Sequence, residues 1–477
     1  MNKDNRNTLR SQTPNGIPPT SNLSPHTSAP TPHTSSETPE TGFFSKIFKG
    51  DKVIWSVFIA LTIISLIEVF SSTSTLVYRQ QNHWGPILRH ATFLLGGVGV
   101  ILFMHNVPYK YFSSLIFVLF ASVILLLLTP LLGERINGAD RWINIMGISI
   151  QPSEIAKISL MGTIAFLLSR QNSKNEKTLF KWMIGLMLGV TFIIAIDNLS
   201  TAILLFLVCF ILMFIGNVKI MRLAKVALLG IAGIVLVVLL LKIIPKPSSE
   251  NGVLKRLATW QSRIDEFGSS DIEDEGSYYQ ITDKNFQVAH SKIAIANGGV
   301  FGKFPGNSKE RDFLPQAYSD FIYSIILEEM GLLGGTFVLI LYIIILMRAG
   351  KIAQKTDKLF PKYLILGSAL MLAIQAFVNM AVAVNLIPVT GQPLPLISRG
   401  GTSTLITCAY FGIILSADRF GKCKKKTEVC PVVDVEVMNI DYMQQEGVEE
   451  NQEENTVEKP VINEEYASDI KFEVIKA

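Results

Sequence analysis

Ten long apolar runs, separated by polar connections, occupy most of this chain between residues 53 and 417. Each run is about 20 residues long, which is the length that a helix needs to cross the hydrocarbon core of a bilayer. The runs span residues 53–73, 87–105, 112–130, 154–170, 179–196, 199–216, 221–244, 320–347, 363–386 and 399–417. The pattern predicts an all-α polytopic membrane protein with about ten transmembrane helices.

Composition supports this class, because hydrophobic residues make up 49% of the 477 residues and charged residues only 17%. The formal net charge of +4 is segregated, with basic residues near the ends of spans and acidic residues in the C-terminal tail. No basic patch on a soluble surface is evident, which argues against nucleic-acid binding. The four cysteines do not suggest a disulfide framework, since Cys209 and Cys408 lie inside apolar runs.

Lysine and arginine residues cluster at the ends of alternate spans. The clusters lie in residues 46–52, 170–177, 219–225, 348–362 and 422–426. All of them fall on one side if the spans alternate, and the positive-inside rule makes that side the cytoplasm. We therefore expect both termini in the cytoplasm and the connections after the third and seventh spans on the outer face.

One connection is far longer than the rest. Residues 245–320 form a large polar loop between spans seven and eight, expected to be extracytoplasmic and suited to hold chemistry or a partner. Residues 1–42 are rich in Ser, Thr and Pro and predict a disordered cytoplasmic arm. Residues 43–420 then form the membrane domain, and residues 421–477 a cytoplasmic tail that is first basic and then acidic and flexible.

The connection after the third span leads into a motif with two opposite charges. Pro152 suits the first turn of a helix, which places Glu154 and Lys157 three residues apart on one helical face. Charges at this depth are costly unless they are paired or wetted, so we expect an intramembrane ion pair that faces a cavity. The alternative is an ion pair that only fixes helix packing.

Two further polar segments lie between spans. Residues 195–202 form a tight outward turn, in which Asn198 or Ser200 is expected to cap the sixth span. Residues 385–403 contain three prolines and three glycines, so they cannot form one continuous helix. Such backbone is tolerated near membrane depth where protein shields it or where it lines a watery cavity. Arg399 lies beside two glycines, where the backbone can approach a ligand closely, so this segment could bind a phosphate. The same combination of residues is also found in re-entrant loops that bind no ligand.

Four motifs resemble those of the SEDS family of FtsW, RodA and SpoVE proteins. They are GADRWINIMGISIQPSEIAK, GGVFGKFPGNS, DFLPQAYSDFIYSIILEEMGLLG and LPLISRGGTS. The resemblance runs in order over residues 53–418, and both tails lie outside it. It implies a ten-span peptidoglycan glycosyltransferase that polymerises lipid II outside the cytoplasmic membrane and is paired with a class B penicillin-binding protein.

The resemblance also implies a catalytic carboxylate in the long loop. The family pattern Trp-x-x-x-x-Asp-Pro is best matched by Trp260 to Asp265, with Glu266 in place of the proline. An acidic insertion over residues 270–285 then separates this site from Gln287, so Asp283 is the runner-up. A carboxylate would serve as general base for the attacking 4-hydroxyl, and cations or preorganised donors would stabilise the departing lipid pyrophosphate.

Other side chains in or beside these motifs are expected to support the site or bind substrate. Lys157, held by Glu154, would orient the site or meet negative charge. The remaining candidates are Arg141, Gln151, Ser153, Gln287, Lys292, Asn307, Asp320, Ser398 and Arg399. Asp320 is also expected to cap the eighth span. Glu328 and Glu329 are interpreted as structural, since neighbouring residues on a helix point about 100° apart and only one of them would easily face a common cavity.

The long tails favour a division-type, FtsW-like member at the septum over an elongation-type, RodA-like one. Other readings are a lipid II flippase, which also needs intramembrane charges, or a non-catalytic scaffold for division proteins. Expected partners are lipid II, a class B penicillin-binding protein transpeptidase and other divisome proteins. No cofactor is certain, and a divalent cation stays open because no His/Asp cluster with metal spacing demands one.

Overall fold

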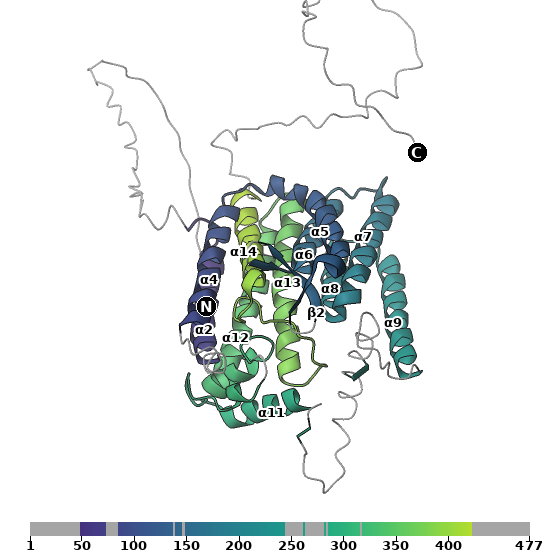
Figure 1. The fold of residues 1–477 in the computed structure, drawn as a ribbon. Helices are drawn as coiled ribbons and strands as arrows, with labels where there is room; N and C mark the ends of the chain where they lie inside the picture. Colours follow the sequence, from purple (N-terminus) through teal and green to yellow (C-terminus); the bar gives the residue numbers. More distant parts are fainter. Residues whose placement is uncertain are drawn as a thin grey trace, which may run out of the picture. The chain divides into compact units, whose positions relative to one another are not determined.

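The computed structural model describes residues 48–72, 84–136, 139–145, 148–243, 261–262, 281–282, 285–314 and 317–421. The long helices lie side by side (Figure 1). They are α2 (Lys52–Ser72), α4 (Gly85–Met104), α5 (Leu115–Leu132), α6 (Pro152–Ser169), α7 (Glu176–Asp197), α8 (Leu199–Ile215), α9 (Ile220–Ile243), α12 (Ile322–Gln354), α13 (Leu359–Ala383) and α14 (Gly401–Gly421). The shorter elements are η1 (Tyr109–Ser114), β1 (Glu134–Ile136), β2 (Ala139–Ile145), β3 (Ile148–Ile150), α11 (Phe286–Gly298) and η2 (Glu310–Asp312).

Each apolar run of the sequence coincides with one of these long helices. Six helical stretches in the described part of the chain are long and apolar enough to cross a membrane, and α8 is a shorter apolar helix. The six are Lys52–Ser72, Gly85–Met104, Tyr109–Leu131, Glu176–Asp197, Ile322–Gln354 and Leu359–Ala383. A helical, multi-pass membrane protein is therefore confirmed. The count of ten transmembrane spans, the direction of each span and the domain limits stay predictions.

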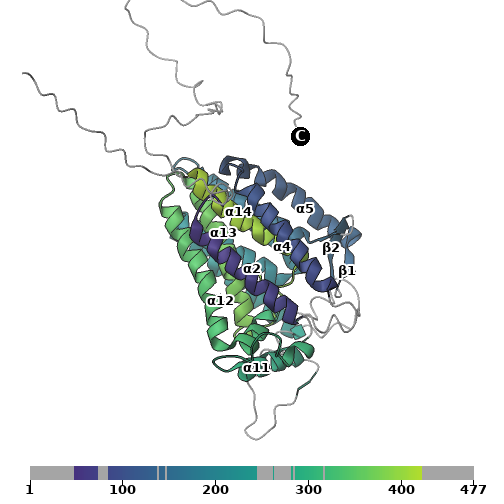
Figure 2. The same cartoon turned by 90° about the vertical axis from the view of Figure 1, so that its left-hand side faces the viewer.

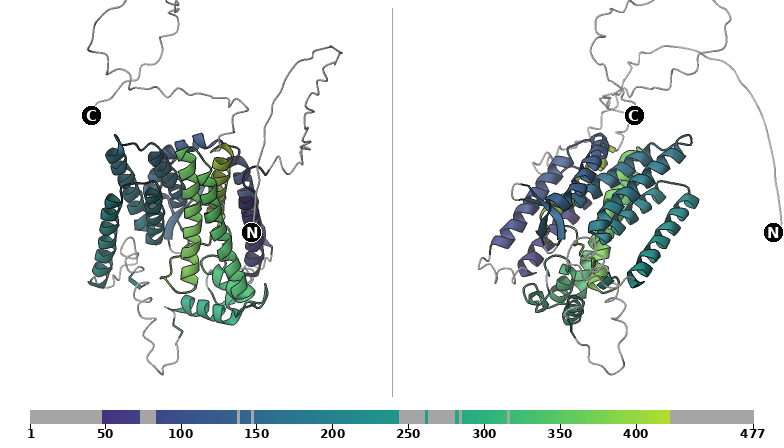
Figure 3. Two further views of the ribbon diagram at one scale, coloured as in Figure 1. Left: turned by 180° about the vertical axis from the view of Figure 1, so that it is seen from behind. Right: turned by 45° about the vertical axis from the view of Figure 1, so that its right-hand side comes forward.

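Helix α13 is the most buried of these six stretches, and it contacts α6, α8, α12 and α14 (Figure 3, left). Small residues allow this close packing. A Cβ on Gly367 would lie only 2.6 Å from Sδ of Met161 on α6. The outer helices instead present large apolar side chains outward, such as Phe117 and Leu131 on α5, which are 74% and 81% exposed. Such a surface suits contact with lipid.

A small antiparallel sheet, which the sequence interpretation did not include, lies between α5 and α6. Its order is β1-β2-β3, with Glu134 opposite Trp142 and Ile143 opposite Ile150. The strands occupy the polar connection, where apolar residues alternate with polar ones over a short stretch and helical periodicity is lost. The sheet delivers the chain to Pro152, the first residue of α6. Thr402 of α14 donates a hydrogen bond to the carbonyl of Ser149, 3.0 Å away.

Helix α2 begins at a charged cap outside the membrane-spanning segment. The Asp51 carboxylate accepts hydrogen bonds from the N–H groups of Val53 and Ile54 at 3.0 and 3.2 Å. Its other oxygen lies 2.6 Å from the guanidinium of Arg348 on α12. Burial by itself would raise the pKa of Asp51, but the bonds from Arg348 and the two amides together lower it below its usual value. The cap thus ties α2 to α12 at the cytoplasmic side predicted above.

Helix α12 is broken at Gly331, which has φ 67° and ψ −172°. The break frees peptide groups on both sides, and residues 299–304 satisfy them. The N–H groups of Leu332 and Leu333 donate to the carbonyls of Gly299 and Val300, at 3.0 and 3.2 Å. In return, the N–H groups of residues 303 and 304 donate to the carbonyls of residues 328 and 329. The broken helix and the segment after α11 therefore form one interlocked unit.

We expect Gly298→Ala to destabilise this unit by about 3 kcal/mol, as strong overpacking does. The added Cβ would lie 1.9 Å from the carbonyl oxygen of Leu327 on α12, and that backbone has no room to shift. The measurement is the melting temperature in detergent. The matched control is Gly185→Ala in α7, where nothing lies within 4 Å of the added Cβ. Equal melting temperatures for both variants would contradict the interlocked packing.

Candidate functional site

A buried ion pair lies at the start of α6. The Nζ atom of Lys157 is 2.7 Å from Oε1 of Glu154, and the lysine side chain is fully buried. Nζ also lies 3.4 Å from Oε1 of Gln375 on α13. The ion pair that the sequence predicted is thus present on α6, and Lys157 connects it to Gln375 on α13. That the pair faces a cavity stays a prediction. A buried lysine in such a position needs its anion, because an unpaired charge at this depth is very costly.

A small pocket adjoins the first turn of α6. Leu126, Thr129, Gln151, Ser153, Ile194, Asp197 and Asn198 line it. The pocket therefore joins two motifs that lie more than 40 residues apart in the sequence, the one before α6 and the turn between α7 and α8. Of the two capping candidates, Asn198 and Ser200, it is Asn198 that caps α8, since its side chain accepts a hydrogen bond from the N–H of Thr201 at 3.1 Å. Gln151 and Ser153 lie at this hollow, where the amide of Gln151 donates to the hydroxyl of Ser153 at 2.9 Å. Their role in substrate binding stays a prediction.

Residues 384–400 connect α13 to α14 without forming a helix, as the prolines and glycines predicted. Side chains from three surrounding helices bind their backbone. Gln375 and Asn379 of α13 donate to the carbonyls of Pro393 and Gln392 at 3.0 and 2.8 Å. Ser65 of α2 donates to the carbonyl of Ile397 at 2.9 Å, and Tyr342 of α12 donates to that of Pro395 at 2.5 Å. Protein groups therefore satisfy this non-helical backbone, which is the condition for its presence at membrane depth.

Gln375 and Gln392 connect all three predicted motifs into one network. Gln375 receives a hydrogen bond from Lys157 and donates one to residues 384–400. Gln392 donates to the hydroxyl of Thr201 at 2.8 Å, which links the same segment to the turn before α8. Sequence reasoning did not single out Gln375. A polar amide in the middle of a predicted span was the available signal, because such residues are expensive in a membrane and seldom lack a role.

Ser398 and Arg399 lie against the chain just before α12. The hydroxyl of Ser398 donates to the carbonyl of Ser319 at 2.6 Å and accepts from the N–H of Leu394 at 2.7 Å, so it holds the backbone. The backbone N–H of Arg399 donates to the carbonyl of Tyr318 at 2.9 Å, and its guanidinium lies 5.2 Å from the centre of the Tyr318 ring. Stacking leaves the edge of a guanidinium available for an anion.

Four other predicted residues lie on the segments around α11 and the start of α12. Gln287 and Lys292 are on α11, which packs against α12. Asn307 is exposed, and its side chain donates to the carbonyl of Lys303 at 2.9 Å, a local turn contact. Asp320 accepts a hydrogen bond from Ser319 at 2.9 Å. Its predicted capping of α12 is wrong, because Phe321 holds the cap position and makes no side-chain capping bond.

The predicted catalytic carboxylates lie outside the described residues. This applies to both Asp265 and its runner-up Asp283. The backbone of Arg141 is part of β2, while the position of its side chain is not described. Within the described ranges, no group of three or more His, Cys, Asp or Glu side chains could hold a metal ion.

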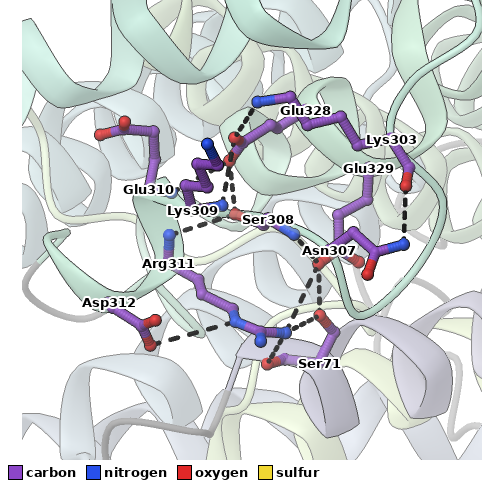
Figure 4. A network of polar contacts seen from close by, with 10 residues as sticks. All are labelled: Ser71, Lys303, Asn307, Ser308, Lys309, Glu310, Arg311, Asp312, Glu328 and Glu329. Carbon is purple, nitrogen blue, oxygen red and sulfur yellow. Dashed lines mark hydrogen bonds and ion pairs between the residues drawn. The ribbon is translucent and has the colours of Figure 1, made fainter.

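Glu328 and Glu329 form the polar network drawn in Figure 4. Glu328 accepts from the hydroxyl of Ser308 and lies 3.1 Å from Nζ of Lys303. Glu329 accepts from the hydroxyl of Ser71 on α2 and, at 3.3 Å, from the N–H of Ser308. Their structural role agrees with the sequence interpretation. Residues 303–311 contact both carboxylates. The expectation that only one of them would easily face a common cavity stays a prediction.

The segments that carry these motifs are similar in sequence to known proteins. A sequence model described as "Cell cycle protein" and named for FtsW, RodA and SpoVE matches residues 51–423. The "Probable peptidoglycan glycosyltransferase FtsW" of Geobacter sp. (strain M18) is 28% identical over 375 residues, which cover 77% of this chain and 96% of that protein. The "Stage V sporulation protein E" of Bacillus subtilis (strain 168) is 31% identical over 338 residues, which cover 69% and 86%.

Two solved structures share the fold. One is described as "Structural coordination of polymerization and crosslinking by a peptidoglycan synthase complex", with a TM-score of 0.62 and 22% identity, over 78% of this chain and 98% of that one. The other is the Thermus thermophilus rod shape determining protein RodA, with a TM-score of 0.55 and 21% identity, over 80% and 100%. The arrangement of helices described above is therefore that of a known membrane fold.

Proposed function

We propose that this chain, which belongs to the FtsW, RodA and SpoVE family of cell cycle proteins, is a peptidoglycan glycosyltransferase. It polymerises lipid II into glycan strands on the outer face of the cytoplasmic membrane during septal wall synthesis. The relatives that carry the name of that enzyme support the activity. The observation that carries the assignment to a site is the network around Lys157, which joins three separate motifs within the family match.

The reaction joins the 4-hydroxyl of one sugar to the anomeric carbon of another. A new C–O bond forms, the bond from the anomeric carbon to the lipid pyrophosphate breaks, and the hydroxyl proton passes to a base. We assign the base to Asp265, with Asp283 as the alternative. A carboxylate in this role typically contributes a factor of about 10² to 10⁴ in rate.

Cationic and amide groups around the network stabilise the negative charge of the departing pyrophosphate. Lys157 is held by Glu154 and cannot move far, so it supplies a fixed positive charge rather than a mobile one. Arg399 supplies a second cation beside two glycines that permit close approach of a ligand. Arg141 and Lys292 are further candidates. A divalent cation at the pyrophosphate would also stabilise its negative charge. Loss of polymerisation in EDTA and its recovery on addition of Mg²⁺ would identify such a cation.

We place both termini in the cytoplasm, and we expect a class B penicillin-binding protein transpeptidase and other divisome proteins as partners. The solved synthase complex with a similar fold supports a partner of this kind. A fluorescent fusion to the full chain tests the division role. A ring at midcell is expected, whereas scattered foci along the lateral wall would indicate the elongation role.

The activity itself is tested with the purified chain and its transpeptidase partner in liposomes that contain fluorescent lipid II. Glycan chains resolved on a gel are the expected product. Movement of lipid II between leaflets without any polymer would replace the proposal with a flippase. Neither polymer nor movement, in a protein that binds its partner, would favour a scaffold.

A further inference from the structure

Glu68 is a fully buried carboxylate without a partner among the described residues. It lies on α2 at 0% exposure, and neither of its oxygens has a hydrogen-bond partner. Ser72 follows four residues later on the same face of α2, also at 0% exposure, and its hydroxyl is unpartnered as well. Buried polar groups are nearly always satisfied, so two orphans on one helical face indicate that something is held between them.

Helix α2, which carries Glu68, packs against α12, which carries a second buried carboxylate, Glu329 (Figure 2). Glu68 interacts electrostatically with Glu329, whose Oε2 is also unpartnered. The other oxygen of Glu329 accepts from Ser71, which lies on α2 between Glu68 and Ser72. Four oxygen atoms without hydrogen-bond partners therefore belong to three fully buried side chains: both carboxylate oxygens of Glu68, the hydroxyl of Ser72 and Oε2 of Glu329.

The charges in this region do not balance. Glu328 is paired with Lys303, whose Nζ lies 3.1 Å away, and Glu329 has Arg311 at 4.0 Å. Glu68 has no cation of its own within the described part of the chain. Two buried carboxylates at one helix contact repel each other strongly, because no water screens them. Among the described residues, one more positive charge would relieve this repulsion.

We propose that Glu68, Ser72 and Glu329 form a buried site for one small monovalent cation, a proton or a sodium ion. A proton would neutralise the Glu68 carboxylate, while a sodium ion would take the free oxygens as ligands. In both cases the cation joins α2 to α12 beside the segment that holds Glu328. Other charged or titratable groups around this contact are His90, which is bonded to Ser65, and Lys303, Lys309, Glu310, Arg311, Asp312 and Glu328.

The site is tested by the melting temperature of the purified full chain in detergent. It is measured between pH 5 and pH 9, at constant ionic strength, in sodium chloride and in choline chloride. If the cation is a proton, the folded state keeps a proton that an unfolded glutamate loses above its ordinary pKa. Stability then falls as the pH rises, by up to tenfold in the folding constant per pH unit, and sodium has no effect. If the cation is sodium, the melting temperature rises with sodium and not with choline, most clearly at high pH.

Glu68→Gln supplies the decisive comparison, because the amide keeps the shape and removes the charge. It should remove the sodium dependence or flatten the pH dependence, whichever the unmodified chain shows. The control is Asp357→Asn, which changes an exposed residue between α12 and α13 and should leave both dependences intact. Identical pH and sodium dependences for the unmodified chain and Glu68→Gln would overturn the site.

Ser72→Ala provides the same test if Glu68→Gln does not fold. The hydroxyl has no partner to lose, so the substitution is mild. Removal of the hydroxyl takes away one ligand or hydrogen-bond donor of the site. The midpoint of the pH dependence should then shift by at least about half a pH unit, or the midpoint of the sodium dependence by at least about threefold in sodium concentration. An unchanged midpoint would overturn the site. These readouts measure stability alone, so their failure would leave the proposed glycosyltransferase activity untouched.

Discussion

Asp265→Asn should abolish the formation of glycan chains from lipid II, with a loss of at least about 100-fold in rate. The asparagine keeps the size of the side chain but cannot accept the proton of the attacking hydroxyl. Binding of lipid II and of the transpeptidase partner should survive, because neither depends on proton transfer. The measurement is the yield of polymer on a gel, together with the amount of partner that co-purifies.

Asp283→Asn is the matched control for this prediction, since it removes a carboxylate from the same loop. It should retain polymer formation close to that of the unmodified chain. Full activity in Asp265→Asn together with its loss in Asp283→Asn would transfer the role to the runner-up. Full activity in both variants would remove the general base from these two positions.

Lys157→Met should destabilise the protein by about 3–5 kcal/mol and eliminate polymerisation. The side chain of Lys157 is fully buried and that of Glu154 is 10% exposed, so the variant leaves a nearly buried carboxylate without its cation. It also removes the link to Gln375 and hence to residues 384–400. Stability is measured by the unfolding free energy in mixed micelles, and activity by polymer yield.

Two comparisons separate stability from function in this prediction. The double variant Glu154→Gln, Lys157→Met removes both charges and should recover most of the stability, yet stay inactive because the fixed cation is gone. Lys219→Met breaks a pair of similar length, 3.2 Å from Glu176, but the lysine is 64% exposed, so the cost should be below about 1 kcal/mol. Recovery of activity in the double variant would show that the pair only fixes helix packing.

The parts of the fold that hydrophobicity determines could be predicted from the sequence. The ten apolar runs coincide with helices, and the cap at Asn198 was predictable because it depends on residues three positions apart. The break at Gly331 was not, because a single glycine within an apolar run does not change the hydrophobic pattern. Its partner segment, residues 299–304, is distant in sequence, so only the folded chain reveals their exchange of hydrogen bonds.

The candidate site divides in the same way. The pairing of Glu154 with Lys157 follows from their spacing on one helix. The roles of Gln375 and Gln392 depend on contacts across 218 and 191 positions, respectively, which no local pattern encodes. Glu68 is a third case: a carboxylate inside an apolar run was visible in the sequence, but its meaning depends on Glu329, which comes from another helix. Local rules identify such residues, and packing decides what they do.

The most direct measurement is the product formed from fluorescent lipid II by the unmodified chain with its transpeptidase partner, compared with Asp265→Asn at equal amounts. The account predicts a ladder of long glycan chains from the unmodified protein and only unreacted lipid II from the variant. Equal polymer from both would refute the role of Asp265. A partner-bound, folded and unmodified chain that makes no polymer at all would contradict the central claim.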